Sequence, residues 1–246
     1  MIRLCHLYPD LLNLYGEYAN LTVLARALTQ CGQEVEICHV DPGDPIDLSG
    51  VDLVYAGAGT ESRIELARRA LEPYAEIFRK AAAAGLPMLF TGSAAELTAK
   101  TLTGLDGAEQ PCLGITDCRA VRTDGRELGD VLYRSDLSEN LLAGFLNKSG
   151  YLTDVAAPLF TAEFGPGGIR GSDGKELPAE GIRQGNVFAT YALGPILARN
   201  PWLKRKLAAI ILERAIGSGD VSAIADDWSD KGYAITVREL QKREEK

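Results

Sequence analysis

The sequence has few of the residues that commonly serve in proton transfer and metal binding. It contains only two histidines, His6 and His39, in 246 residues. Any mechanism that needs an imidazole must therefore use one of these two. The five cysteines form no CxxC pair and fall mostly in apolar segments, at Cys5, Cys31, Cys38, Cys112 and Cys118. This spacing favours buried, reduced thiols over a redox or zinc site, and we expect no metal and no cofactor.

Long apolar runs and blocks of basic residues are also missing. No run approaches the ~20 apolar residues of a membrane-spanning helix, and the N-terminal MIRLCHLYPD lacks the apolar centre of a signal peptide. The net charge is −8, and Lys and Arg are not concentrated in any segment. A nucleic-acid-binding protein needs such a basic surface to neutralise phosphates. We therefore exclude nucleic acid as a main partner and expect a cytoplasmic protein without a membrane span.

What the chain does contain is apolar sequence for a sizeable core. Hydrophobic residues make up 46% of the sequence, which is ample for one α/β domain with insertions. No internal repeat or linker divides the chain. We expect a single domain over residues 1–246, in which residues 217–246 form a C-terminal extension.

Apolar periodicity in the first hundred residues alternates between strand and helix. Leu21, Leu24 and Leu28 lie on one face of a predicted helix that Gly32 ends. A second helix is expected between Thr60 and Gly85. Short apolar segments typical of buried strands are at residues 2–7, 35–40, 51–57 and 87–92. The order β-α-β-β-α-β predicts an α/β fold with a largely parallel sheet and helices on both faces.

The second half has a different pattern. From Cys112 to Tyr191 we expect short strands, such as CLGITDCRAV, DVLYRS and NVFATYA, separated by turns rich in Gly and Asp. These strands predict an antiparallel lobe. Pro201 begins an amphipathic helix that directs Leu203, Leu207, Ile210 and Ile211 inward, and the charged RELQKREEK tail is expected to form a solvated helix.

The segment GLPMLFTGSAAELTAK, residues 85–100, has the order strand, tight turn of small residues, helix. Ligands of an open parallel sheet bind beyond the carboxyl ends of its strands, which places His6, residues 57–60 and residues 92–95 on one rim. A turn of this kind exposes a nucleophile and directs backbone N–H groups at an oxyanion. Small residues also allow a helix to pack closely on a strand, so the turn alone does not establish a catalytic role.

Four segments together resemble one family: HLYPDLLNLYGEYANLTVLARAL, GLPMLFTGSAAEL, GFLNKSG and GNVFATYALGPILARNP. They are similar to the class I glutamine amidotransferase subunit of lipid II isoglutaminyl synthase, the GatD family, which is related to cobyric acid synthase amidotransferase domains. The resemblance implies a flavodoxin-like sheet. It also implies a cytoplasmic subunit that hydrolyses glutamine and passes ammonia to a Mur-ligase-like partner of the MurT type, which amidates the D-glutamate of lipid II in peptidoglycan synthesis.

Such chemistry needs a cysteine thiolate, a histidine and backbone donors for the oxyanion, and two of these are substituted here. The family pattern G-x-P-V-L-A-x-C-G-G-Y-Q-L-L-G places the nucleophile five residues after a proline, and counting from Pro87 gives Gly92. The family histidine of T-Y-L-H-G-P-L-L-x-R-N corresponds to Leu193 in TYALGPILARN.

The surroundings of these positions differ from the family pattern as well. The two glycines after the nucleophile are Ser93 and Ala94, the usual glutamine is Glu96, and a second family histidine corresponds to Lys148. The loop G-G-G-Q-D has become GAGTE, in which Gly57 and Gly59 remain as expected substrate-binding positions. Scaffold residues are retained nevertheless, at Asn147, Gly150, Tyr191, Gly194, Pro195, Arg199 and Asn200. This combination predicts an amidotransferase-like pseudoenzyme that forms a heterodimer with its partner.

Arg126 has two interpretations. The segment DGRELGDV resembles an R-x-x-G segment of the family, and this implies an arginine that holds the carboxylate of glutamine through charge-assisted hydrogen bonds. The other interpretation is a solvent-facing turn residue. If Arg126 enters the pocket, glutamine or another small carboxylate binds there without being cleaved.

Two further functions stay open. The first is a serine hydrolase, because TGSAA fits an elbow centred on Ser93 and His6 lies on the same rim. A hydroxyl without an adjacent base is a poor nucleophile. The alternative role for Ser93 is N-capping or packing. The second open function is that of a non-catalytic binding or scaffold subunit of a Mur-ligase-like partner.

Overall fold

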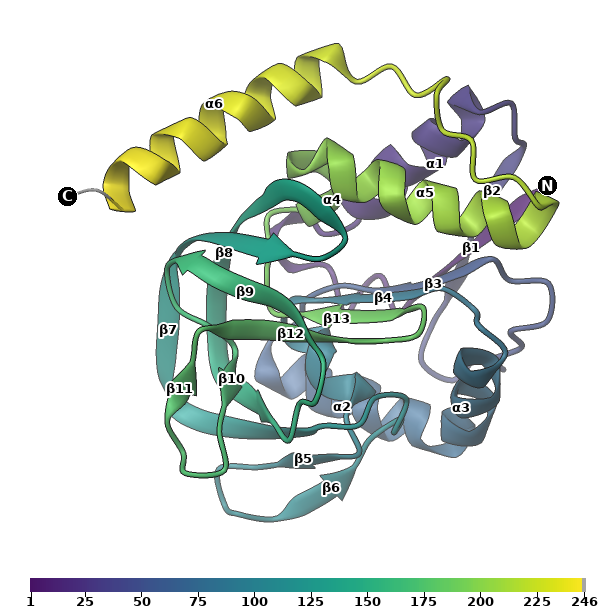
Figure 1. Ribbon diagram of the computed structural model, residues 1–246. Coiled ribbons are helices and arrows are strands. Elements are labelled where there is room, and N and C mark those ends of the chain that lie inside the picture. Colours follow the sequence, from purple (N-terminus) through teal and green to yellow (C-terminus); the bar gives the residue numbers. More distant parts are fainter. Residues whose placement is uncertain (245–246) are drawn as a thin grey trace.

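Four parallel strands from the first half of the chain form the centre of the fold. The computed structural model describes residues 1–244 (Figure 1). The elements of this half are β1 (Ile2–Leu7), α1 (Ala19–Gln30), β2 (Val35–Val40), β3 (Leu53–Ala56), α2 (Glu61–Leu71), α3 (Ala75–Ala83) and β4 (Met88–Thr91). The strands pair in the order β2-β1-β3-β4, and every pair is parallel. The predicted α/β organisation is confirmed.

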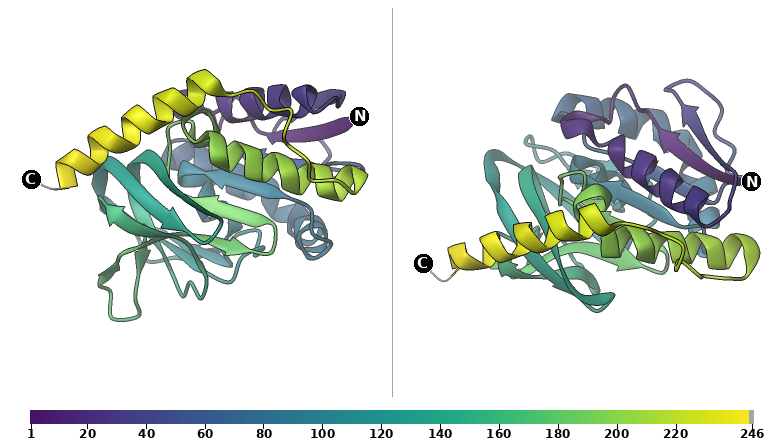
Figure 2. Two further views of the ribbon diagram at one scale, coloured as in Figure 1. Left: turned by 45° about the horizontal axis from the view of Figure 1, so that its top comes forward. Right: turned by 90° about the horizontal axis from the view of Figure 1, so that it is seen from above.

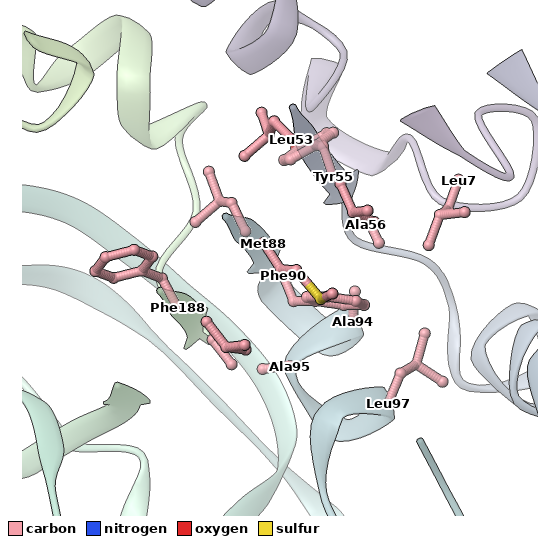
Figure 3. Packing of buried hydrophobic residues seen from close by; sticks show 14 of the residues in the cluster. Leu7, Leu53, Tyr55, Ala56, Met88, Phe90, Ala94, Ala95, Leu97 and Phe188 are labelled. Atoms are coloured by element: carbon pink, nitrogen blue, oxygen red, sulfur yellow. The ribbon is translucent and has the colours of Figure 1, made fainter. Parts of the chain in front are cut away.

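The most deeply buried strands are β3 and β4, in which every residue is buried. Figure 3 shows Tyr55 of β3 and Phe90 of β4 within this core, close to Ala94 and Leu97 of the segment that follows β4. In contrast, β2 lies at the edge of the sheet and is largely exposed. The expectation that residues 35–40 form a buried strand is therefore wrong, because an edge strand has a neighbour on one side only.

The second half extends the same sheet with mostly antiparallel pairs. It contains β5 (Thr101–Thr103), β6 (Glu109–Pro111), β7 (Arg119–Ser135), β8 (Ser138–Thr153), β9 (Pro158–Phe164), β10 (Ile169–Arg170), β11 (Glu176–Leu177), β12 (Ala179–Gln184) and β13 (Val187–Thr190). Within residues 1–244 the main path of the sheet runs β11-β10-β8-β7-β9-β12-β13-β4-β3-β1-β2. The parallel pairing of β13 with β4 joins the two halves. The antiparallel lobe is confirmed.

We expected only short strands in this lobe, but two of them are long. β7 has 17 residues and β8 has 16, and together they form one long hairpin. A solvent-facing turn was one of the two interpretations of Arg126, but β7 continues through this segment with a shift of register between Arg122 and Glu127. The segment from Cys112 to Cys118 contains no strand and forms a loop.

Helices cover both faces of the parallel part. Figures 1 and 2 show α1 next to α5 (Pro201–Ile216) on one face, and α2 with α3 on the opposite face. The single helix expected between Thr60 and Gly85 is two helices, because Pro73 lies in a 3₁₀ turn between α2 and α3. A short helix, α4 (Ile196–Arg199), precedes α5.

The C-terminal helix α6 (Asp227–Glu244) lies across the outside of the antiparallel lobe (Figure 1). The tail is helical as expected, but it is not fully solvated: Leu240 is buried against Leu132 and Ala143, and Arg243 forms a 2.6 Å ion pair with Asp130. The last two residues of RELQKREEK, 245–246, lie outside the described residues. No helix in residues 1–244 has the length and apolar character needed to cross a membrane.

Candidate functional site

A pocket opens beyond the carboxyl ends of β3 and β4, where the loop after β3 meets the turn after β4. The antiparallel lobe supplies its other side through β7 and β8. The lining residues are Leu14, Tyr15, Ala58, Gly59, Thr60, Glu61, Ser93, Glu96, Arg126, Asn147, Lys148, Ser149 and Tyr191. The two segments that the sequence placed on one rim, residues 57–60 and 92–95, both contribute to it.

The turn after β4 has a left-handed backbone at Gly92, where the resemblance places the family nucleophile. Gly92 has a φ of 60°, in the left-handed region, and it begins a 3₁₀ helix, Gly92–Thr98. This helix is shorter and tighter than the one expected after the turn. A positive φ is the sharp strand-to-helix geometry that presents a nucleophile in elbow-type active sites, but glycine has no side chain to present.

Leu193 occupies the space next to this backbone. A Cβ added to Gly92 would lie 2.6 Å from the Cδ2 atom of Leu193 and 2.6 Å from the Cβ atom of Ala58. Leu193 is buried, and two backbone hydrogen bonds to Phe145, of 2.9 and 3.2 Å, hold its main chain in place. The structure therefore brings Gly92 and Leu193, the positions that the resemblance assigns to nucleophile and base, into direct proximity, and apolar atoms fill the space between them.

Under the turn lies a buried carboxylate that the sequence reasoning missed. Glu17 Oε2 accepts hydrogen bonds from the Thr91 hydroxyl, from Tyr55 at 3.1 Å and from Asn20 at 3.2 Å. Burial raises the pKa of Glu17 to about 7, although the hydrogen bonds from Thr91 and Tyr55 oppose this shift. Glu17 is the one charged residue in the largely apolar segment LYGEYANL, and this was the signal from which its burial could have been predicted. Its hydrogen bonds connect the start of α1 to the ends of β3 and β4.

Ser93 connects the two loops of the pocket. Its hydroxyl donates to the carbonyl oxygen of Gly59 at 2.7 Å and accepts from the N–H of the same residue at 3.0 Å. It does not cap the 3₁₀ helix, whose N-cap residue is Thr91. The serine therefore fastens the loop after β3 to the turn after β4.

His6 is not placed to assist Ser93. Its ring packs against His39 and Tyr55, with centroid separations of 5.6 and 5.3 Å, and within residues 1–244 no hydrogen bond joins it to Ser93. Burial and the neighbouring His39 lower the pKa of His6 to about 4. An uncharged, buried imidazole packed on aromatic rings is a core residue at this position.

Arg126 lies at the mouth of the pocket, on the irregular segment of β7. Its guanidinium donates to Glu61 Oε1 at 2.5 Å and to Asn147 Oδ1 at 2.8 Å. Ser149 donates to the same Glu61 oxygen at 2.5 Å. Burial acts against ionisation of Glu61, but the hydrogen bond from Ser149 and the charge of Arg126 leave its pKa below the ordinary value. Arg126 is thus a pocket residue that already has a carboxylate partner.

Two further charged side chains are buried in the same wall. Lys148 forms an ion pair with Glu127, donates to the Gly150 carbonyl oxygen at 3.2 Å and lies 5.7 Å above the ring of Tyr191. Glu96 forms a 3.3 Å ion pair with Arg122. Burial raises the pKa of Glu96 to about 7 against the effect of Arg122. Glu96 and Lys148 therefore each form a buried ion pair in this wall.

The two glycines expected to bind substrate differ in position. Gly59 lines the pocket, and a Cβ on it would lie 2.9 Å from Leu12 Cδ2. Gly57 lies behind the lining, where a Cβ would lie 2.6 Å from the Leu12 carbonyl oxygen. Both positions require glycine for close approach of the chain.

All five cysteines are free and three of them are buried, and residues 1–244 contain no cluster of three or more potential metal ligands.

Comparison with known proteins connects this geometry to a biochemical class. The chain is 27% identical over 199 residues to the GatD subunit of lipid II isoglutaminyl synthase (glutamine-hydrolyzing) from Staphylococcus aureus (strain N315), covering 81% of this chain and 79% of that protein. It is 25% identical over 241 residues to the GatD subunit from Streptococcus pneumoniae (strain ATCC BAA-255 / R6), covering 93% and 91%. No family model matches the chain. The expected resemblance to GatD is confirmed.

Solved structures show the same fold. PurLQS from Thermotoga maritima contains a chain with a TM-score of 0.56 and 15% identity, covering 87% of this chain and 98% of that one. A glutamine amidotransferase from the same organism has a TM-score of 0.53 and 13% identity, covering 99% and 97%. A further glutamine amidotransferase has a TM-score of 0.54 and 19% identity, covering 84% and 98%. The α/β arrangement is that of glutamine amidotransferases.

Proposed function

We propose that this chain is a GatD-type subunit for the amidation of lipid II that does not itself hydrolyse glutamine. The similarity to two GatD subunits over most of the chain supports the biochemical context. The main support for the proposed loss of hydrolysis is one observation: the Leu193 side chain fills the space into which a side chain at Gly92 would project.

The chemistry explains how this observation supports the proposal. Amide hydrolysis by this route needs a thiolate that attacks the carbonyl carbon and an imidazole that takes and returns a proton. Glycine supplies no nucleophile and leucine transfers no proton. Removal of a nucleophile or base in a comparable enzyme reduces the rate by about 10⁶-fold, and the remaining site does not compensate.

The partner follows from the same context. The relatives are named as subunits, and we propose that this chain forms a heterodimer with a Mur-ligase-like subunit of the MurT type, in the cytoplasm. The ammonia for amidation then comes from a source other than this pocket. Arg126 is the group that would hold the carboxylate of glutamine or of another small ligand. We further propose one domain over residues 1–246, with residues 217–246 as its C-terminal extension.

A serine hydrolase based on Ser93 is less well supported. Its hydroxyl is engaged in both directions with the backbone of Gly59, and His6 lies in the aromatic core. A nucleophile of this type requires a base within hydrogen-bond distance. The hydrogen bonds of Ser93 therefore favour the proposal of a non-hydrolysing subunit.

Co-expression tests the partner. The chain is produced with a Mur-ligase-like protein from the same genome, and the mixture is separated by size-exclusion chromatography at micromolar concentration. We expect one peak that contains both chains in equal amounts, with and without glutamine. A ligase from a different step of cell-wall synthesis serves as the control and should elute separately. Separate elution of the Mur-ligase-like protein as well would contradict the proposal.

A further inference from the structure

The pocket contains two kinds of group that bind oxygen atoms of a ligand. In an elbow-type site the oxyanion is held by the N–H of the residue after the nucleophile and by an N–H from a neighbouring strand-to-helix loop. Here Ser93 follows the nucleophile position, and Gly59 lies in the loop between β3 and α2. The second kind of group is the guanidinium of Arg126, whose planar donors suit a carboxylate.

The Gly59 N–H already has a hydrogen-bond acceptor within the protein. The Gly59 N–H donates to the Ser93 hydroxyl at 3.0 Å, within the normal range for an N–H···O hydrogen bond. The same hydroxyl donates its proton to the Gly59 carbonyl oxygen at 2.7 Å. A ligand oxygen that approached this N–H would have to displace the hydroxyl and leave two hydrogen bonds unmade.

The second group is occupied in the same way. Glu61 Oε1 accepts hydrogen bonds from the Arg126 guanidinium and from the Ser149 hydroxyl, both at 2.5 Å. A further N–H of the arginine donates to Asn147 Oδ1. The carboxylate of Glu61 thus lies where the carboxylate of an amino acid would be bound. The pair is about half exposed, so a carboxylate from solution can reach it.

We propose that the pocket is self-liganded: Ser93 supplies the oxygen at the Gly59 N–H and Glu61 supplies the carboxylate at Arg126, in place of a bound amino acid. These contacts hold the loop between β3 and α2, the turn after β4 and the irregular segment of β7 together without a ligand. Glu61 is the specificity-determining residue, since a small carboxylate binds only in exchange for it. The inference rests on the proposed function in treating the pocket as the counterpart of a glutamine site.

Calorimetric titration with glutamate tests the Glu61 contact. We expect that the wild-type protein binds glutamate at least about tenfold more weakly than Glu61→Gln, because loss of a charge-assisted hydrogen bond to the arginine frees its donors. The double variant Glu61→Gln/Arg126→Ala should lose this gain. Glu65→Gln is the matched control, since Glu65 lies one turn further along α2 and pairs with Arg68 and Arg69 instead. Equal affinities for the wild type and Glu61→Gln, or a gain that persists without Arg126, would overturn the proposal.

Hydrogen exchange of the Gly59 amide tests the Ser93 contact. Ser93→Ala should raise its exchange rate about fivefold, the effect of losing one neutral hydrogen bond. Ser62→Ala is the control, because Ser62 lies in the first turn of α2, next to this loop, and its hydroxyl contacts Thr60 at 3.1 Å; it should leave the rate unchanged. If Ser93→Ala fails to fold, Ser93→Gly provides the same comparison. An unchanged rate in the folded variant, or labelling of Ser93 by a fluorophosphonate, would overturn this part.

These outcomes are independent of the partner experiment. If the binding and exchange results are as expected but the Mur-ligase-like protein elutes separately, the proposed function fails and the self-liganded pocket stands. If the complex forms but Glu61→Gln gains no affinity for glutamate, the self-liganded pocket fails alone.

Discussion

The floor and the wall of the pocket have changed in different ways. We call the apolar region of Gly92, Leu193 and Ala58 the floor; of these three residues Ala58 lines the pocket, and Gly92 and Leu193 lie behind the lining. The floor is so closely packed that a carbon atom added at Gly92 would collide. The wall, around Arg126 and Lys148, is charged and connected by hydrogen bonds and ion pairs. Nucleophilic attack and proton transfer belong to the floor, whereas ligand recognition belongs to the wall. Under the proposed function, the floor is the part of the pocket without reactive groups, and the wall is the part with a polar binding surface.

The floor keeps its backbone geometry although it has no reactive group. The left-handed glycine follows directly from a buried strand, and the Glu17 network beneath it fixes the end of that strand. Catalytic side chains contribute to reactivity rather than to this framework. A chain can therefore replace them with glycine and leucine and retain the fold.

The largest effect is expected from substitutions in the floor. Gly92→Cys should destabilise the protein by on the order of 2–6 kcal/mol, because a side chain at positive φ and overpacking each cost about 1–3 kcal/mol. Leu193 is one of the two side chains that a Cβ at position 92 would meet, so the effects of Gly92→Cys and Leu193→His on stability should not be additive. Chemical denaturation of both singles and the double variant measures this coupling.

The same variants also report on activity. Neither single should release ammonia from glutamine, and the double should recover only weak hydrolysis, because nucleophile and base act as a unit and misplacement by about 1 Å costs ~10²-fold. A double variant that is folded, yet shows neither coupling in stability nor any gain in hydrolysis, would mean that positions 92 and 193 do not act together.

An intermediate effect is expected beneath the floor, as a dependence of stability on pH. The pKa of Glu17 is about 7 in the folded protein against an ordinary value of 4.5, so the native state binds its proton more tightly than the unfolded state. The free energy of unfolding should therefore fall as pH rises from about 4.5 to 7 and then level off, by about 3 kcal/mol for this group.

Glu17→Gln isolates this contribution, because glutamine resembles the protonated acid. Glu96 and Glu180 are buried with pKa values raised in the same direction, so the variant should show a weaker fall with pH rather than none. Urea denaturation of both proteins at pH 5 and pH 8 provides the measurement. A fall of equal size in the variant would show that Glu17 is ionised in the folded state throughout this range.

The smallest effect is expected at the wall. Arg126→Ala should change the free energy of unfolding by less than about 1 kcal/mol, since the arginine and Glu61 are each nearly half exposed and exposed ion pairs contribute little. Thermal unfolding at low and high salt checks this. A loss comparable to that of Gly92→Cys would make the wall part of the folding core and would remove the distinction between the two regions.

The sequence predicted the framework of the site better than its contacts. Strand-to-helix periodicity located the loop after β3 and the turn after β4, and the family pattern paired Gly92 with Leu193. It did not predict that Arg126 binds Glu61, because the two residues are 65 positions apart and meet only where β7 becomes irregular. The segment TDGRE has the composition of a turn, and residues 123–126 have no register partner in β8, although β7 continues on both sides of them.

Local patterns also failed where burial depends on position in the sheet. Residues 35–40 have the apolar composition of an inner strand, but the strand order places them at an edge. Ser93 resembled a nucleophile or a helix cap, and only the close approach of Gly59 gives its hydroxyl another role. These contacts depend on how distant segments pack, which a single sequence does not encode in a local pattern.

The most direct test of a non-hydrolysing GatD-type subunit is ammonia release from glutamine by the purified chain, alone and in complex with its Mur-ligase-like partner. A diazo-oxo-norleucine labelling experiment on the same samples reports any reactive nucleophile. We predict no ammonia above a control without protein and no covalent label, because Gly92 and Leu193 provide neither thiolate nor imidazole. Glutamine-dependent ammonia release that persists through extensive purification and disappears in a Ser93→Ala variant would contradict the account.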